Sequence, residues 1–155
     1  MEKMCEIKDL AEQPVLSIRT RSSVVSLPKV LGKAFEQLEA RLKELGEEPA
    51  GAPFVAYYNM NMLNLDIEIG FPVKKLLEEN AEIKATTQPA GKYAMTMHQG
   101  PYGKIRPAYN ALTKKVKEEG FQSTGIAYEY YLNDPENTKP NDLLTQVVFP
   151  LKPKG

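Results

Sequence analysis

The feature that most constrains the fold is a repeated order of segments. In the first half, PVLSIRT precedes a helical pattern, LPKVLGKAFEQLEARLKELG, and then the apolar segments PFVAYYN and LNLDIEIGFPV. The second half gives GKYAMTMHQG, YGKIRPAYNALTKKVKEEG, IAYEYYLND and LLTQVVFPL in the same order. Short apolar or alternating runs favour strands, and apolar residues spaced by three and four favour helices. The sequence therefore predicts two successive β-α-β-β halves.

Matching landmarks in the two halves support a true repeat. Each predicted helix ends at a glycine, Gly46 or Gly120, and glycine is favoured just after a helix. Each half closes on Phe-Pro and an aliphatic residue, at Pro72 and Pro150. The two prolines are 78 positions apart and the two glycines are 74 positions apart. The difference fits the longer loop NDPENTKPND in the second half. We predict a repeat at about 13–72, a linker at 73–89 with a short strand near 83–87, and a repeat at about 90–151.

Both predicted helices are amphipathic, which indicates that each lies on a sheet. The first begins after Ser26, a residue type that favours the N-cap position, and the second begins near Tyr102 with Pro107 in its first turn. Two halves that share one core form the economical architecture. We expect a single α+β domain over residues 1–155, with an antiparallel sheet, two main helices on one side and a central ligand cleft.

Composition excludes several classes of function. Twenty basic residues balance twenty acidic ones, so the formal net charge is zero, and we expect no direct binding to nucleic acid. The apolar runs are too short to cross a membrane, and the N-terminus lacks a signal-peptide pattern. One cysteine, Cys5, and one histidine, His98, do not make a zinc site, and we interpret Cys5 as an incidental thiol near a loose terminus. We expect no cofactor, a cytoplasmic location, and a monomer or weak dimer.

Glu129 is the most unusual residue of the predicted strands, because glutamate is depleted in strands and rarely buried without a partner. Alternation places Ala127, Glu129 and Tyr131 on one face, and we expect that face to line the cleft while the opposite face carries the helix. We expect Glu129 to be substantially buried and its pKa to be raised when no ligand is bound. A solvated strand residue is the alternative interpretation.

The repeat extends the candidate ligand site to both halves. Val55 and Tyr57 are the first-half counterparts of Glu129 and Tyr131, and Glu68 is the counterpart of Gln146. The alternation of Asp66, Glu68 and Gly70 with apolar neighbours is equally typical of a wet strand face. The candidate ligand-binding residues are Glu129, Tyr131, Tyr57, Tyr102, Glu68, Gln146, Val55 and Ala127.

The strings HQGPYGKI, EYYLNDP and YYNMNMLNLDIEIGFPV closely resemble the GyrI-like small-molecule-binding domains, over roughly residues 7–151. Such domains also serve as effector-binding domains of AraC-type and MerR-type transcription activators. The resemblance implies a tandem β-α-β-β (SHS2-type) fold with a central cleft, and places the family's signature acid on Glu129. It places cleft aromatic residues on Tyr57, Tyr131 and Tyr102. No helix-turn-helix pattern is present, so we expect a stand-alone member, and the chain has no tryptophan.

The resemblance leaves the activity open between three classes. The first is a binding module for amphipathic, cationic or aromatic drug-like molecules, held by stacking, cation–π contact and the Glu129 charge. The second is a hydrolase that opens cyclopropane-type electrophiles, with Glu129 as general base and Tyr102 as proton donor. A protein-interaction role, such as modulation of gyrase, ranks third. Heme-binding proteins share a similar fold, and His98 would be the residue to ligate heme.

Overall fold

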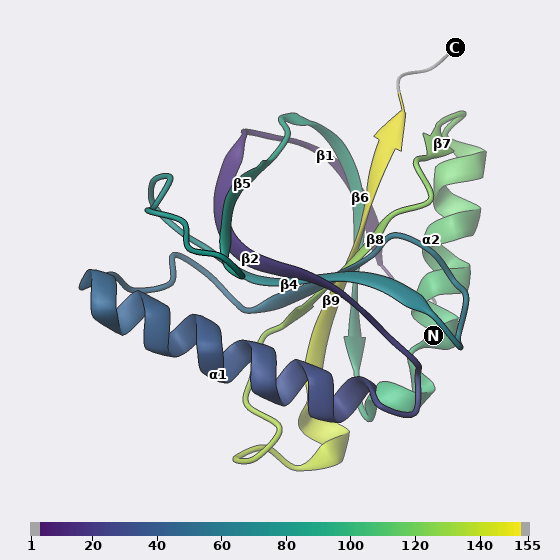
Figure 1. The fold of residues 1–155 in the computed structure, drawn as a ribbon. Coiled ribbons are helices and arrows are strands. Elements are labelled where there is room, and N and C mark those ends of the chain that lie inside the picture. The colour runs from purple at the N-terminus through teal and green to yellow at the C-terminus, as the bar shows by residue number, and fades with distance from the viewer. Residues whose placement is uncertain (1–3, 153–155) are drawn as a thin grey trace. The chain divides into compact units, whose positions relative to one another are not determined.

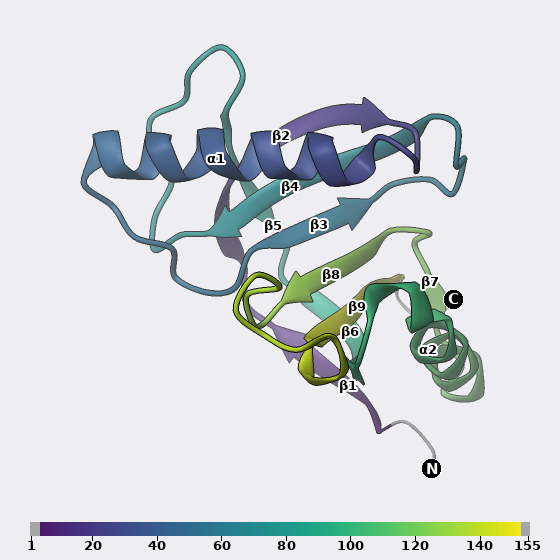
Figure 2. The same ribbon diagram turned by 90° about the horizontal axis from the view of Figure 1, so that it is seen from below.

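The computed structural model describes residues 4–152 and divides the chain into two compact units. One unit comprises residues 12–89, and the other combines the described parts of residues 1–11 and 90–155. Each unit contains a small antiparallel sheet and one α-helix (Figures 1 and 2). The α+β class and the antiparallel pairing predicted from the sequence are therefore confirmed.

The unit of residues 12–89 is built from β2 (Gln13–Ser22), α1 (Leu27–Leu45), β3 (Phe54–Tyr57), β4 (Leu65–Pro72) and β5 (Lys84–Gln88). Its strand order is β3-β4-β2-β5, with antiparallel pairing throughout. The predicted short strand near 83–87 is confirmed as β5, displaced by a single position. Helix α1 buries Ala34, Leu38 and Leu42 and runs along the sheet (Figure 2).

The other unit is built from β1 (Cys5–Leu10), β6 (Gly91–Gln99), α2 (Arg106–Glu118), β7 (Gln122–Ser123), β8 (Ala127–Tyr131) and β9 (Leu144–Lys152). It also contains two 3-10 turns, Tyr102–Lys104 and Pro140–Asp142. Its strand order is β8-β9-β6-β1, and β7 pairs with β9. Helix α2 packs on a core shared by three strands, formed by Ala94, Ala108, Leu112, Val116, Ala127, Val147 and Phe149.

The two units repeat the same topology, down to the pairing of individual residues. Val55 pairs with Ile69, and their counterparts in the second repeat, Glu129 and Val147, also pair. Each unit is completed by an edge strand, β5 or β1, that immediately precedes in sequence the first strand of the other β-α-β-β repeat, β6 or β2. The tandem repeat is therefore confirmed. Cys5 is the first residue of β1.

The C-terminal ends of the helices agree with the sequence signals, and the starts differ. The second helix was expected from about Tyr102, but Tyr102–Lys104 is a separate 3-10 turn and α2 begins at Arg106. Gly46 has φ 67° and Gly120 has φ 79°, the left-handed conformation that favours glycine after a helix. Ser26 was predicted as the N-cap of α1, but its own backbone is helical (φ −85°, ψ −7°) and its side chain makes no cap hydrogen bond. The Ser26 amide instead donates to the Ser23 hydroxyl at 3.2 Å. The side chain that stabilises the turn before α1 is therefore that of Ser23, three residues earlier.

Candidate functional site

Glu129 lies on the face of β8 that carries α2, so the predicted orientation of this strand is wrong. Its neighbour on that face, Ala127, is buried and packs against α2 residues including Leu112. The Tyr109 hydroxyl, on the first turns of α2, donates to Glu129 Oε2. The prediction failed because both faces of β8 are aromatic or apolar, so alternation alone did not identify the side that a helix covers.

Two tyrosines hold the Glu129 carboxylate in place. Tyr109 bonds Oε2, and the Tyr131 hydroxyl donates to Oε1 at 3.0 Å. The Glu129 side chain is partly buried, and within residues 4–152 no lysine or arginine forms an ion pair with it. Burial raises the pKa of the Glu129 carboxyl, and the two hydroxyl donors oppose that rise only in part. The predicted direction of this pKa shift is confirmed.

Aromatic rings surround this carboxylate. The Tyr102 ring meets Tyr131 edge to face, with 5.4 Å between centroids and 63° between planes. The Tyr109 ring packs on Phe149 at 5.7 Å. Burial, followed by the charges of Asp134 and Glu129, raises the pKa of Tyr102. Tyr102 is 37% exposed, which makes it the outermost ring of the group.

The same sheet face carries two polar residues that the sequence did not single out for this site. His98, Thr145 and Tyr131 are register partners across β6, β9 and β8, and alternation puts them on the Glu129 face. His98 is 3% exposed and Thr145 is fully buried. We call the set Glu129, Tyr102, Tyr109, Tyr131, His98 and Thr145 the Glu129 cluster.

Of the predicted ligand residues outside this cluster, Ala127 and Gln146 are in the same unit, and Val55, Tyr57 and Glu68 belong to the unit of residues 12–89. In the second repeat, Gln146 points to the opposite face of β9, where its side-chain amide contacts Met95 Sδ at 3.6 Å. Val55 is fully buried and Tyr57 is half-buried in β3. Both are on the α1 face, since they pair with Ile69 and Ile67, which alternate in phase with Phe71, a residue that contacts Phe35 of α1.

Glu68 forms a separate polar cluster on the face of β4 that points away from α1. It accepts hydrogen bonds from the hydroxyls of Ser17 and Tyr58, each at 2.6 Å, and from Thr86 at 3.3 Å. Arg19 stacks over the Tyr58 ring at 3.7 Å and makes a bidentate pair with Asp66. Glu68 is 8% exposed, so the interpretation of a wet strand acid is wrong for this residue. Three hydroxyl donors satisfy it without a ligand.

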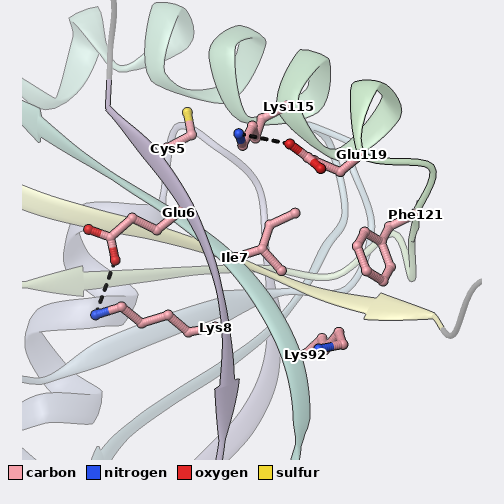
Figure 3. A pocket seen from close by; sticks show the side chains of 8 residues that line it. All are labelled: Cys5, Glu6, Ile7, Lys8, Lys92, Lys115, Glu119 and Phe121. Carbon is pink, nitrogen blue, oxygen red and sulfur yellow. Dashed lines mark ion pairs between the residues drawn. The ribbon is translucent and has the colours of Figure 1, made fainter.

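A shallow surface depression lies elsewhere, between β1, β6 and α2 (Figure 3). Its volume is about 530 Å³, and its lining includes Cys5, Ile7, Lys115 and Phe121. Lys115 is engaged by Glu119 at 3.0 Å. The lining of this depression contains no residue of the Glu129 cluster. In the described part of the chain, no group of three or more His, Cys, Asp or Glu side chains is placed to hold a metal ion, and no helix is long and apolar enough to span a membrane.

The tandem β-α-β-β fold indicates a class of protein that the comparison with protein families identifies. Residues 3–152 match the family described as the GyrI-like small molecule binding domain, and the chain belongs to that family. No curated protein sequence matches this chain.

Three solved structures illustrate the similarity of fold. The chain is similar to EcmrR in an EcmrR–DNA complex, with 22% identity and a TM-score of 0.84, over 98% of this chain and 58% of that chain. It is similar to a hydrolase from Listeria innocua, with 13% identity and a TM-score of 0.75, over 97% and 93% of the two chains. It is also similar to SAV2435 bound to tetraphenylphosphonium, with 12% identity and a TM-score of 0.63, over 99% and 95%.

Proposed function

We propose that this chain is a receptor domain for small amphipathic cations with an aromatic body, bound at the Glu129 cluster. The observation that carries the proposal is a partly buried carboxylate oriented by two tyrosines, Tyr109 and Tyr131, with no cationic side chain of residues 4–152 paired to it. A desolvated carboxylate without a counter-charge is costly, and a bound cation relieves that cost. The tyrosine rings add stacking and cation–π contact.

The family and its relatives support this class of ligand. The domain family is described as small-molecule-binding, and one structural relative is bound to tetraphenylphosphonium, a lipophilic aromatic cation. The relative EcmrR acts in a DNA complex, and this chain spans 58% of that protein chain. A role as the effector-binding part of a transcription regulator, including a multidrug-responsive one, is compatible with the proposed site, as is a stand-alone cytoplasmic receptor.

A matched pair of probes tests the proposal. 1-Methylquinolinium and 1-methylnaphthalene have nearly the same shape and differ in charge, so their affinities isolate the contribution of the acid. We expect the parent protein to bind the cation measurably more tightly in calorimetry. Glu129→Gln should weaken binding of the cation, because the desolvated counter-charge is removed, and leave the neutral probe unaffected.

Glu68→Gln is the matched control, because Glu68 is also a strand acid removed from solvent, and its three hydroxyl donors belong to the other unit. It should leave the preference for the cation unchanged. Equal affinity of the parent protein for the two probes, or an unchanged preference in Glu129→Gln, would contradict the proposal.

A hydrolase is the second candidate, favoured by the raised pKa of Glu129 and the protonated Tyr102 beside it. A base whose pKa lies closer to neutral accepts a proton from water more readily. In this reaction the water oxygen would bond to a carbon of a strained ring, the carbon–carbon bond would break, Glu129 would take the water proton and Tyr102 would donate to the developing anion. Incubation with an activated cyclopropane and mass spectrometry would detect the addition of one water. Turnover that is lost in Glu129→Gln while the product still binds would identify an enzyme.

A further inference from the structure

Two fully or almost fully buried side chains next to Glu129 have polar atoms that no described residue satisfies. They are His98 Nδ1 and Thr145 Oγ1, both without a hydrogen-bond partner within residues 4–152. Most buried polar side-chain atoms in proteins have such a partner, so an unmet pair on one sheet face indicates a role. The two residues are direct register partners on β6 and β9. Residues opposite each other on antiparallel strands have Cβ atoms about 5 Å apart, so both can reach one small group.

The hydrogen-bond partner of His98 Nε2 determines whether Nδ1 of the neutral ring is a donor or an acceptor. His98 Nε2 lies 2.9 Å from the carbonyl oxygen of Pro101. A carbonyl oxygen can only accept, so Nε2 must carry the hydrogen of the neutral ring. Nδ1 of the neutral imidazole is then an acceptor. The turn HQGPY, which brings Pro101 back to His98, thereby sets the tautomer.

The unmet capacity of the Glu129 cluster consists mainly of acceptors. Each Glu129 oxygen receives one tyrosine hydroxyl, which leaves further lone pairs on the carboxylate. His98 Nδ1 adds a lone pair, and Thr145 Oγ1 can accept as well as donate. A bound group that matches these atoms must supply several hydrogen-bond donors, and a positive charge would complement Glu129.

We propose that His98 and Thr145, together with Glu129, select ligands whose cationic group carries N–H donors, as in a primary ammonium, over quaternary cations. This inference rests on the proposed function and specifies its ligand class. His98 and Thr145 are enclosed, at 3% and 0% exposed, so neighbouring side chains must move aside before a head group contacts them. The aromatic body of the ligand stays outside, against Tyr102 and Tyr131.

The test compares three probes that share one body: 2-naphthylmethylammonium, its trimethylammonium derivative and the neutral 2-naphthylmethanol. Calorimetry on the full chain should give the primary ammonium at least about tenfold tighter binding than the trimethyl derivative, which is one hydrogen bond's worth of free energy. Thr145→Val keeps the shape of the side chain and removes its hydroxyl. It should reduce that preference by about tenfold and leave the affinity for the trimethyl derivative unchanged.

A second variant and a control keep the test decisive. His98→Gln retains an N–H near the position of Nε2 for Pro101 but removes the Nδ1 acceptor, and it should also reduce the preference. Thr96→Val is the control, because the Thr96 hydroxyl is already bonded to the Met4 carbonyl at 2.8 Å, and it should keep the preference. A parent protein that binds both cations equally, or a preference retained in both Thr145→Val and His98→Gln, overturns the inference but leaves the receptor proposal standing. A parent protein that binds neither cation more tightly than the alcohol overturns both.

Discussion

Glu129 couples the site to the stability of the protein through its protonation. Burial raises the pKa of this carboxyl in the folded state more than the tyrosine hydroxyls lower it. A raised pKa means that the folded protein binds this proton more tightly than the unfolded chain does. The resulting stabilisation is complete below the ordinary glutamate pKa and is lost as the pH rises through the raised value.

Glu129→Gln should therefore gain stability relative to the parent protein as the pH increases. The difference in free energy of unfolding between the variant and the parent should be larger at about pH 8 than at about pH 4, because the parent alone loses stability on ionising its buried acid. Urea denaturation at several pH values measures this difference. Tyr109→Phe removes a hydroxyl that lowers the pKa of Glu129. The loss of stability that accompanies ionisation of Glu129 should therefore occur at higher pH in this variant than in the parent protein. A difference between Glu129→Gln and the parent that is constant over this range would contradict the prediction.

Sequence reasoning identified Glu129, Tyr131 and Tyr102, which the structure brings together, but missed Tyr109, Thr145 and the role of His98. The signal for Tyr109 was present in the repeat, since Phe35 is its first-half counterpart in the same alignment that matches Val55 with Glu129. A valine changed to an acid and a phenylalanine changed to a tyrosine, at equivalent places, indicate a new polar contact. Thr145 left no such signal, because a threonine in a strand is ordinary. Only the tertiary pairing reveals that its hydroxyl is unsatisfied.

At the scale of elements, the helix packs on the sheet through an equivalent pair of aromatic rings in both repeats, but only the second repeat has a hydroxyl on the helix ring. In the first repeat, Phe35 of α1 meets Phe71 with 5.6 Å between ring centroids. In the second, Tyr109 and Phe149 form the equivalent pair at 5.7 Å. The strand pairing and the aromatic contact under the helix could be predicted from the repeat. The face of β8 that α2 covers could not, because both faces of that strand are apolar or aromatic.

The apolar residues of the first repeat suggest a pair of substitutions that would remove the polar contact from the second repeat. Tyr109→Phe with Glu129→Val would give the second repeat the residues found at Phe35 and Val55. Glu129→Val alone should destabilise, because the Tyr109 hydroxyl loses its carboxylate partner in a partly buried site. The double variant should recover that loss and equal or exceed the stability of the parent, since replacing both partners by apolar groups of similar shape is often neutral or stabilising.

A double-mutant cycle measured by chemical denaturation checks this expectation. The coupling energy between the two positions should be about 0.5–3 kcal/mol, as for residues in direct contact. The double variant should also lose its preference for cationic probes, which separates the function of the pair from its contribution to folding. Strict additivity of the two single changes would contradict a direct interaction.

At the scale of the whole chain, charge is the property that bears on partners. Twenty basic and twenty acidic residues give a formal net charge of zero. The densest basic run, at Lys114, Lys115 and Lys117 of α2, is partly neutralised by ion pairs of Lys114 with Glu118 and of Lys115 with Glu119. Binding to the phosphate backbone depends on basic groups that displace counterions, and this surface offers few of them.

The polypeptide of residues 1–155 should therefore bind duplex DNA no more tightly than about 10⁻⁴ M at physiological salt, the weak limit of non-specific binding. Fluorescence anisotropy with a labelled duplex, repeated at several salt concentrations, measures both the affinity and its salt dependence. The variant Glu118→Lys with Glu119→Lys is the positive control, because it removes both ion pairs and creates a run of basic residues at the end of α2. Its affinity should rise and should fall steeply with added salt, because each neutralised phosphate releases a counterion. Tight, salt-sensitive binding by the parent polypeptide would contradict the prediction and would place DNA contact within this domain itself.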